Sequence, residues 1–239
     1  MSSGSRSGSG VDVGTFGLIL DLDGTLVDSY DAITESLNHA RAMYGLEPLD
    51  PATVRAAVGH GLEHLIGEWV GPDRIEDGVR HFRERYAAVF AAGTRPLPGV
   101  DATLHGLARV GYRMALASNK PARFSTLILR QLSWDDLFVT VEGPDTVGTT
   151  KPHPAMLRRC LDRMGTATER TLYVGDMPLD AVTGRRAGVE VVLVTGGSAP
   201  PAELNSAGST VLAGLAALPA WLSDRGWPAS RDAAPGPLS

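Results

Sequence analysis

Residues 17–28 read Gly-Leu-Ile-Leu-Asp-Leu-Asp-Gly-Thr-Leu-Val-Asp, and this stretch decides the fold. Its first part is a short uncharged run, which is typical of a strand buried on both faces of a parallel sheet, although a buried helix would show the same run. The run ends in Asp21 and Asp23, which lie two positions apart and point the same way if the backbone stays extended. Both carboxylates would then enter the crevice where open α/β sheets bind ligands, and Gly24 would let the backbone turn there.

Two carboxylates so close together need a partner of opposite charge. At a separation of about 4 Å and an effective dielectric near 20 they repel by roughly 4 kcal/mol, so both stay ionised only beside a cation. A hard ion that prefers oxygen ligands suits them best, and we therefore expect Mg²⁺ at this strand end.

The composition narrows the class of protein. The 239 residues carry a net charge of −5, which argues against a general affinity for nucleic acid or for anionic membranes but leaves room for a local positive pocket. Cys160 is the only cysteine and cannot form an internal disulfide, so we expect a cytoplasmic protein. No apolar run approaches the roughly 18 residues that span a bilayer. The segments 1–10 and 228–239 are predicted to be flexible tails.

The segment 29–95 is predicted to be an all-helical insert. Ser29 is a candidate helix cap, and apolar residues follow it at helical spacing. Similar patterns predict three more helices, at 51–58, 62–70 and 73–92. No strand is expected in this insert, and its Pro- and Gly-rich exit suits a hinge.

From residue 96 onward, strand and helix patterns alternate. The predicted strands lie at 113–117, 138–141, 171–174, 189–194 and 210–212. The predicted helices lie at 100–111, 121–132, 154–164, 179–187 and 215–222. Such repetition implies a parallel sheet with right-handed crossovers and helices on both faces. The expected fold is a doubly wound, Rossmann-like α/β core, formed by 11–28 and 96–227, with the helical cap 29–95 inserted after the first strand.

Three further strand ends carry polar residues. Ser118 and Asn119 precede a helix start, whose free N–H groups and a hydroxyl could hold a phosphate, although these residues also make ordinary caps. Lys151 offers a compact positive charge just before the next helix. Asp176 and Asp180 are four apart and can converge if the turn runs into a helix, where they could also be acidic residues of its first turn.

The other lysine of the chain, Lys120, is expected to be a solvated surface residue. His153, beside Lys151, is expected to be an ordinary loop residue.

Taken in chain order, the four strand ends resemble the motifs of the haloacid dehalogenase-like hydrolases, and within them those of the phosphatases. Residues 21–29 resemble the first motif, Ser118 the second, the Lys-Pro-His-Pro run from Lys151 the third, and 175–180 the fourth. The chain departs from the family pattern at Met177, where a Ser, Thr or Asn is common, which bears on the hydrogen bonding around the metal.

The resemblance implies a phosphoric monoester hydrolase. Asp21 would be the nucleophile that forms an aspartyl-phosphate, and Asp23 would protonate the leaving alcohol and then deprotonate the attacking water. The implied ligands of Mg²⁺ are Asp21, the backbone carbonyl of Asp23, and Asp176, with Asp180 supporting them from behind. The implied phosphate-binding residues are Thr25, Ser118, Asn119 and Lys151.

The helical cap would close over the site and supply substrate contacts. Val58-Gly59-His60-Gly61 resembles the corresponding loop of phosphoglycolate phosphatases, so Gly59, His60 and Gly61 are candidate substrate-binding residues, although a loop histidine between glycines can also be incidental. The expected partner is a small phosphorylated metabolite, with phosphoglycolate, pyrophosphate and a phosphorylated sugar all compatible. The chain is expected to be a monomer or a homodimer.

Some neighbouring chemistries are disfavoured and others stay open. A dehalogenase of this family lacks the second acid, Asp23, and a phosphonatase needs a cap lysine, whereas no lysine occurs between Ser29 and Gly111. A phosphomutase or a pyrophosphatase of the same superfamily shares the acid pair and stays open. A non-catalytic binding or regulatory protein that keeps the fold is the alternative of another class, and the intact acid set argues against it.

Overall fold

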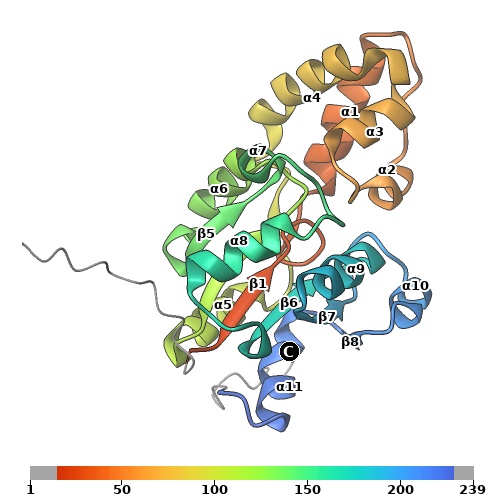
Figure 1. Ribbon diagram of the computed structural model, residues 1–239. Helices are drawn as coiled ribbons and strands as arrows, with labels where there is room; N and C mark the ends of the chain where they lie inside the picture. Colours follow the sequence, from red (N-terminus) through yellow and green to blue (C-terminus); the bar gives the residue numbers. More distant parts are fainter. Residues whose placement is uncertain (1–14, 229–239) are drawn as a thin grey trace, which may run out of the picture.

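The computed structural model describes residues 15–228. The two predicted tails, apart from Pro228, lie outside the described residues. Within that range the central feature is a six-stranded sheet of strand order β5-β4-β1-β6-β7-β8 (Figure 1), and every neighbouring pair of strands is parallel. The strands are β1 (Gly17–Leu20), β4 (Arg113–Ala117), β5 (Phe138–Glu142), β6 (Thr171–Gly175), β7 (Glu190–Val194) and β8 (Thr210–Leu212).

The first strand lies in the middle of the sheet because it is apolar on both faces. β1 pairs with β4 on one side and with β6 on the other. Leu18 and Leu20 enter one hydrophobic cluster and Ile19 enters the other, as the alternation of side chains along a strand requires. The carboxyl end of β1 therefore opens into the middle of the sheet edge.

Helices cover both faces of this sheet. One face is packed by α5 (Val100–Val110), α6 (Ala122–Gln131) and α11 (Leu218–Asp224). The other is packed by α8 (Ala155–Met164), α9 (Pro178–Ala187) and α10 (Pro201–Ser206). The predicted doubly wound α/β fold is thus confirmed. Two short helices, α10 and α7 (Pro144–Val147), were not predicted because six and four residues are too few to show a helical period.

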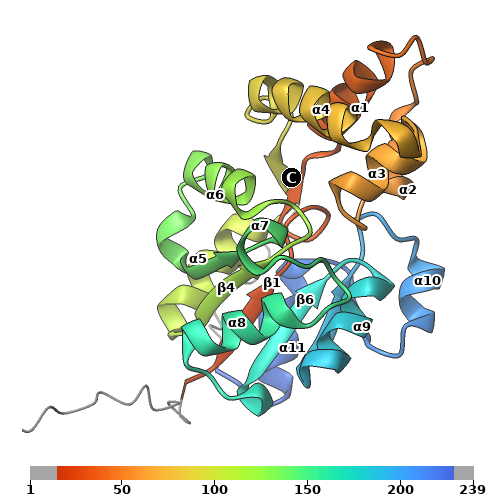
Figure 2. The same ribbon diagram turned by 45° about the horizontal axis from the view of Figure 1, so that its top comes forward.

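The chain between β1 and β4 begins with a block of helices that stands apart from the sheet (Figures 1 and 2). Its members are α1 (Tyr30–Ala42), α2 (Pro51–Ala57), α3 (Leu62–Trp69) and α4 (Ile75–Val89), with a 3₁₀ turn at Pro72–Arg74. They share a separate hydrophobic cluster, which includes the buried side chains of Leu37, Ile66 and Phe82 and is joined by Phe124 from α6 of the core. The boundaries predicted for this cap, 29 and 95, stay predictions.

A small antiparallel ribbon joins the helical block to the sheet. It pairs β2 (Val27–Asp28) with β3 (Arg95–Pro96), one strand at the entrance of the block and one at its exit. Arg95 reinforces this junction through an ion pair of 2.7 Å with Asp31. Strands of two residues carry no readable alternation, so the sequence did not predict the ribbon.

In the part of the chain that the structure describes, no helix is both long enough and apolar enough to cross a membrane.

Candidate active site

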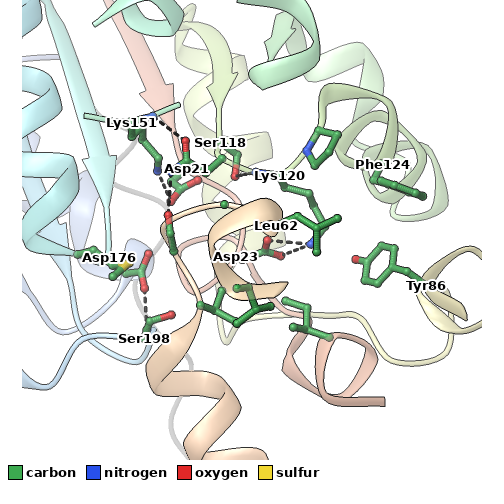
Figure 3. Close-up of a pocket in the computed structure, with 18 of the residues that line it drawn as sticks. Asp21, Asp23, Leu62, Tyr86, Ser118, Lys120, Phe124, Lys151, Asp176 and Ser198 are labelled. Carbon is green, nitrogen blue, oxygen red and sulfur yellow. Dashed lines mark hydrogen bonds and ion pairs between the residues drawn. The ribbon is translucent and has the colours of Figure 1, made fainter. Parts of the chain in front are cut away.

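A pocket lies between the helical cap and the carboxyl ends of the strands (Figure 3). Its floor comes from the core and includes Asp21, Ser118, Lys151 and Asp176. The side chains predicted from four separate strand ends therefore line one pocket.

Asp21 and Lys151 form the buried centre of the pocket floor. Lys151 Nζ lies 2.7 Å from Asp21 Oδ2 and 2.7 Å from Asp180 Oδ1. Asp180 Oδ1 also accepts a hydrogen bond of 2.6 Å from the hydroxyl of Tyr173 on β6. The other Asp21 oxygen, Oδ1, accepts the backbone N–H of Leu22 at 2.8 Å, so the carboxylate is held at both oxygens.

Charge is not balanced at this centre. The carboxylates of Asp21, Asp176 and Asp180 can each bring one oxygen within 4.8 Å of the other two, and Lys151 is the only cation paired with them among the described residues. Burial raises the pKa of Asp21 to about 6, against the opposing charge of Lys151. Burial and the charges of Asp180 and Asp21 raise the pKa of Asp176 well above its usual value. These carboxylates can hold a divalent metal ion, because such an ion would supply the missing positive charge.

Asp176 is held by the loops around it. Its Oδ2 accepts the backbone N–H of Ser198 at 2.7 Å, and its Oδ1 accepts the hydroxyl of Thr25 at 3.3 Å. Glycines make these close approaches possible, since a Cβ on Gly197 would lie 2.0 Å from Asp176 Oδ2. Thr25 was expected to bind phosphate. In the structure its buried hydroxyl donates to Asp176, and phosphate binding by Thr25 stays a prediction.

Asp180 is the most deeply buried of the three carboxylates. Its Oδ1 is taken by Lys151 and Tyr173, and its Oδ2 accepts the backbone N–H of Met177 at 3.0 Å. Met177 thus contributes a backbone donor at the start of α9, and its side chain turns towards the cap, where it would lie 2.1 Å from a Cβ on Gly59.

Asp23 forms an ion pair with Lys120, which the sequence pattern did not predict. Lys120 Nζ lies 3.0 Å from Asp23 Oδ1 and 2.8 Å from Oδ2, and the Ser29 hydroxyl donates to Oδ1 at 2.5 Å. The expectation that Lys120 is a solvated surface lysine was wrong, because its side chain is only 7% exposed. One feature of the sequence could have indicated that Lys120 belongs to the pocket: the chain otherwise uses arginine, and both of its lysines follow strands.

The loop after β4 supplies Ser118 and Asn119. Ser118 lines the pocket, and its hydroxyl oxygen accepts the backbone N–H of Lys120 at 3.3 Å. Both ends of the Asn119 amide are already used: Oδ1 accepts the N–H of Lys151 at 2.7 Å, and Nδ2 donates to the carbonyl of Gly59 at 2.8 Å. Asn119 was expected among the phosphate-binding residues, but its side chain joins the Lys151 loop to the cap.

The cap contributes a mostly apolar roof. Leu62, Leu65 and Tyr86 line the pocket together with Gly59 and Gly61 of the predicted substrate loop. His60, the third candidate of that loop, is exposed, and its ring lies 5.2 Å from the ring of His64 on the surface. The loop therefore meets the pocket through its glycines, and the side chain of His60 points elsewhere.

Comparison with known proteins agrees with this geometry. The profile of the haloacid dehalogenase-like hydrolases matches residues 18–194. The chain belongs to this family. It is 35% identical over 216 residues to the phosphoglycolate phosphatase of Rhodospirillum rubrum, covering 86% of this chain and 90% of that one. It is 33% identical to that of Aquifex aeolicus, covering 75% and 84% of the two chains.

Solved structures show the same architecture for this haloacid dehalogenase-like hydrolase. The crystal structure of a predicted phosphoglycolate phosphatase from Haemophilus somnus superposes with a TM-score of 0.76 at 26% identity, covering 87% of this chain and 97% of that one. A hydrolase from Pseudomonas syringae superposes with a TM-score of 0.75 at 22% identity, covering 90% and 100%. At 22% identity, the similarity to the Pseudomonas syringae hydrolase shows that the two chains share a fold and no more.

Proposed function

We propose that this hydrolase is a Mg²⁺-dependent phosphatase that cleaves a small phosphomonoester through an aspartyl-phosphate on Asp21. One observation carries the proposal: the buried carboxylate of Asp21 lies against Lys151, with Asp176 beside them, on the floor of a pocket that the cap covers. A carboxylate nucleophile can attack an anionic phosphoryl group only where positive charge offsets the repulsion between them.

The protein's own residues would divide the reaction into two displacements. In the first, an Asp21 oxygen attacks the phosphorus, the bond to the leaving oxygen breaks, and Asp23 gives that oxygen a proton. In the second, water attacks the phosphorus of the aspartyl-phosphate, Asp23 takes the proton from the water, and the Asp21 carboxylate leaves as inorganic phosphate forms. Ser118 and Lys151 would hold the other phosphoryl oxygens throughout.

The proposed metal ligands are Asp21, Asp176 and the backbone carbonyl of Asp23, with Asp180 behind them. Mg²⁺, when bound there, would draw negative charge from the phosphoryl oxygens. Support comes from the donor set itself: all the candidate groups are oxygens, and of the three clustered buried carboxylates only Asp21 and Asp180 are paired with the lysine. Thr25 and Ser198 would keep Asp176 turned towards the ion.

The helical segment 29–95 is proposed to act as a cap that excludes water while the aspartyl-phosphate exists. Its apolar residues in the pocket roof, such as Leu62 and Leu65, support this role. We propose phosphoglycolate or a similar small phosphomonoester as the substrate, because the relatives named above are phosphoglycolate phosphatases.

Release of inorganic phosphate from 4-nitrophenyl phosphate tests the reaction class. We expect turnover that requires Mg²⁺ and disappears with EDTA. A panel that includes phosphoglycolate, pyrophosphate and sugar phosphates then identifies the substrate, and transfer of the phosphoryl group within a sugar phosphate would identify a mutase. A folded protein that releases no phosphate from any of these with Mg²⁺ present would contradict the proposal.

A further inference from the structure

Lys120 and Asp23 both line the pocket and form a largely buried ion pair. The mechanism proposed above gives Lys120 no role. The two nitrogen-oxygen distances, 3.0 and 2.8 Å, show that the ammonium engages both carboxylate oxygens. The side chains are 7% and 12% exposed, so solvent screens the pair little. A buried ion pair contributes little net stability compared with well-packed apolar residues, so stability alone does not account for it.

The other side of the Lys120 ammonium is covered by the cap. Lys120 Nζ lies 4.8 Å from the ring centroid of Tyr86 on α4, within the range of a cation–π contact. The Tyr86 ring meets Phe124 of α6 edge to face at 5.1 Å, which fixes where the ring stands over the ammonium. Figure 3 shows Lys120 between Asp23 and Tyr86, so one ammonium links a core carboxylate to a cap helix.

We propose that Lys120 is a positioning residue for Asp23 and that Tyr86 completes its arrangement when the cap is closed. This inference rests on the proposed function, in which Asp23 is the general acid. With Ser29 on Oδ1 and Lys120 on both oxygens, the Asp23 carboxylate has one defined orientation at the pocket wall, in which it would receive a proton before it acts as the general acid. Tyr86 excludes water from the ammonium, so the orientation depends on the cap being in place.

The consequence can be measured through the leaving group. 4-Nitrophenyl phosphate and phenyl phosphate are nearly the same shape, but nitrophenolate departs readily without a proton and phenolate departs poorly. A displaced general acid therefore harms the second substrate more. The parameter to compare is kcat/KM, because it covers the steps up to departure of the leaving group and leaves out hydrolysis of the aspartyl-phosphate.

For Lys120→Met we expect kcat/KM to fall for phenyl phosphate by a factor at least about tenfold larger than for 4-nitrophenyl phosphate, in line with the usual contribution of general acids. Asp23→Asn should show the same selectivity, and adding Lys120→Met to it should change the ratio no further. Since the ratio compares two substrates on one preparation, a partly unfolded sample does not alter it.

Tyr86→Leu provides a second variant that keeps Lys120 itself. It should shift the ratio in the same direction by a smaller factor. Phe90→Leu is its matched control, because Phe90 stacks on Tyr86 at 6.1 Å but does not line the pocket, and it should leave the ratio unchanged.

If Lys120→Met lowered kcat/KM by the same factor for the two substrates, the inference would be overturned. The same would hold if only KM rose, equally for both, and Lys120 would then be a substrate-binding residue. Failure of the wild-type protein to hydrolyse either aryl phosphate would instead contradict the proposed function.

Discussion

Lys151 is the residue on which the electrostatics of the pocket floor depend. It makes close ion pairs with two buried carboxylates, Asp21 and Asp180, at 2.7 Å each. Burial alone would lower the pKa of Lys151, but the charges of Asp180 and Asp21 raise it above its usual value, so the ammonium stays charged. The lysine thus neutralises part of the acidic cluster before any metal or substrate arrives.

Replacing Lys151 by Met should abolish turnover and lower the free energy of unfolding by about 3–5 kcal/mol, because two buried carboxylates lose their common partner. Urea denaturation and phosphate release measure the two effects. The double variant Lys151→Met/Asp180→Asn removes one of the unpaired charges, so it should regain part of the stability and stay inactive. A single variant as stable as the wild type would contradict the role given to this lysine.

The Asp21→Asn variant should lose turnover and keep its fold, since an amide of the same shape cannot form the acyl phosphate. Phosphate release and circular dichroism are the measurements. Asp162→Asn, on the exposed side of α8, is the matched control and should behave like the wild type. Near-normal phosphatase activity in Asp21→Asn would rule out covalent catalysis by this residue.

The sequence predicted those site residues that follow strands directly. Asp21, Ser118 and Asp176 lie at or just beyond the ends of β1, β4 and β6, where topology alone brings them together. Lys120 was misassigned because its partners are set by loop conformation and by a cap helix that sequence spacing does not place. The direction of a side chain in a loop is a tertiary property.

At the scale of the element, the loop between α2 and α3 is a part of the cap that contacts the core loops of the pocket, through Asn119 and Met177. Gly59 has φ +133° and Gly61 has φ +99°, a region that side chains disfavour. A Cβ on Gly59 would lie 2.1 Å from the sulfur of Met177, whereas a Cβ on Gly61 would only touch Thr150 at 3.6 Å.

Gly59→Ala should therefore reduce kcat/KM and the melting temperature more than Gly61→Ala does. Both variants place a side chain at positive φ, so the loss in Gly61→Ala measures the backbone strain. The additional loss of kcat/KM and melting temperature in Gly59→Ala then measures the clash with Met177. Adding Met177→Ala to Gly59→Ala should reverse that additional loss. Equal effects of the two alanine variants in steady-state kinetics and thermal unfolding would show that the contact with Met177 is unimportant.

Longer elements were predicted better than short ones, for a physical reason. Helices such as α4 and α8 span several turns, so one apolar face recurs often enough to be read. The β2–β3 ribbon and helix α7 are held by pairing and by prolines at particular positions, and neither leaves a period in the sequence. The apolar run at 17–20 and the alternation of strand and helix after residue 96 were together sufficient to predict a parallel sheet.

At the scale of the whole molecule, stability should depend on metal and pH together. The pKa of Asp21 is raised from 3.8 to about 6, so without metal the folded state holds more protons than the unfolded state between those values, and stability falls as pH rises from about 4 to 6. Asp176 shifts in the same direction.

Adding Mg²⁺ should reverse this trend, because the ion binds the ionised carboxylates. At a concentration about 100 times its Kd it should stabilise the protein by about 2.7 kcal/mol. Thermal unfolding at pH 5 and pH 8, with Mg²⁺ and with EDTA, measures the effect, which should be larger at pH 8. If the melting temperature at pH 8 were the same with Mg²⁺ and with EDTA, that result would argue against a metal site formed by these carboxylates.

Asn119 holds the backbone N–H of Lys151 with one end of its amide and the carbonyl of Gly59 with the other. If the cap moved away from the sheet, the second of these hydrogen bonds would break, and the Asn119 amide would be free to turn and would hold the Lys151 loop less firmly. Opening of the pocket and loosening of the Lys151 ammonium beside Asp21 would then be coupled. The Lys151 loop would therefore be fully anchored only while the cap contacts the core.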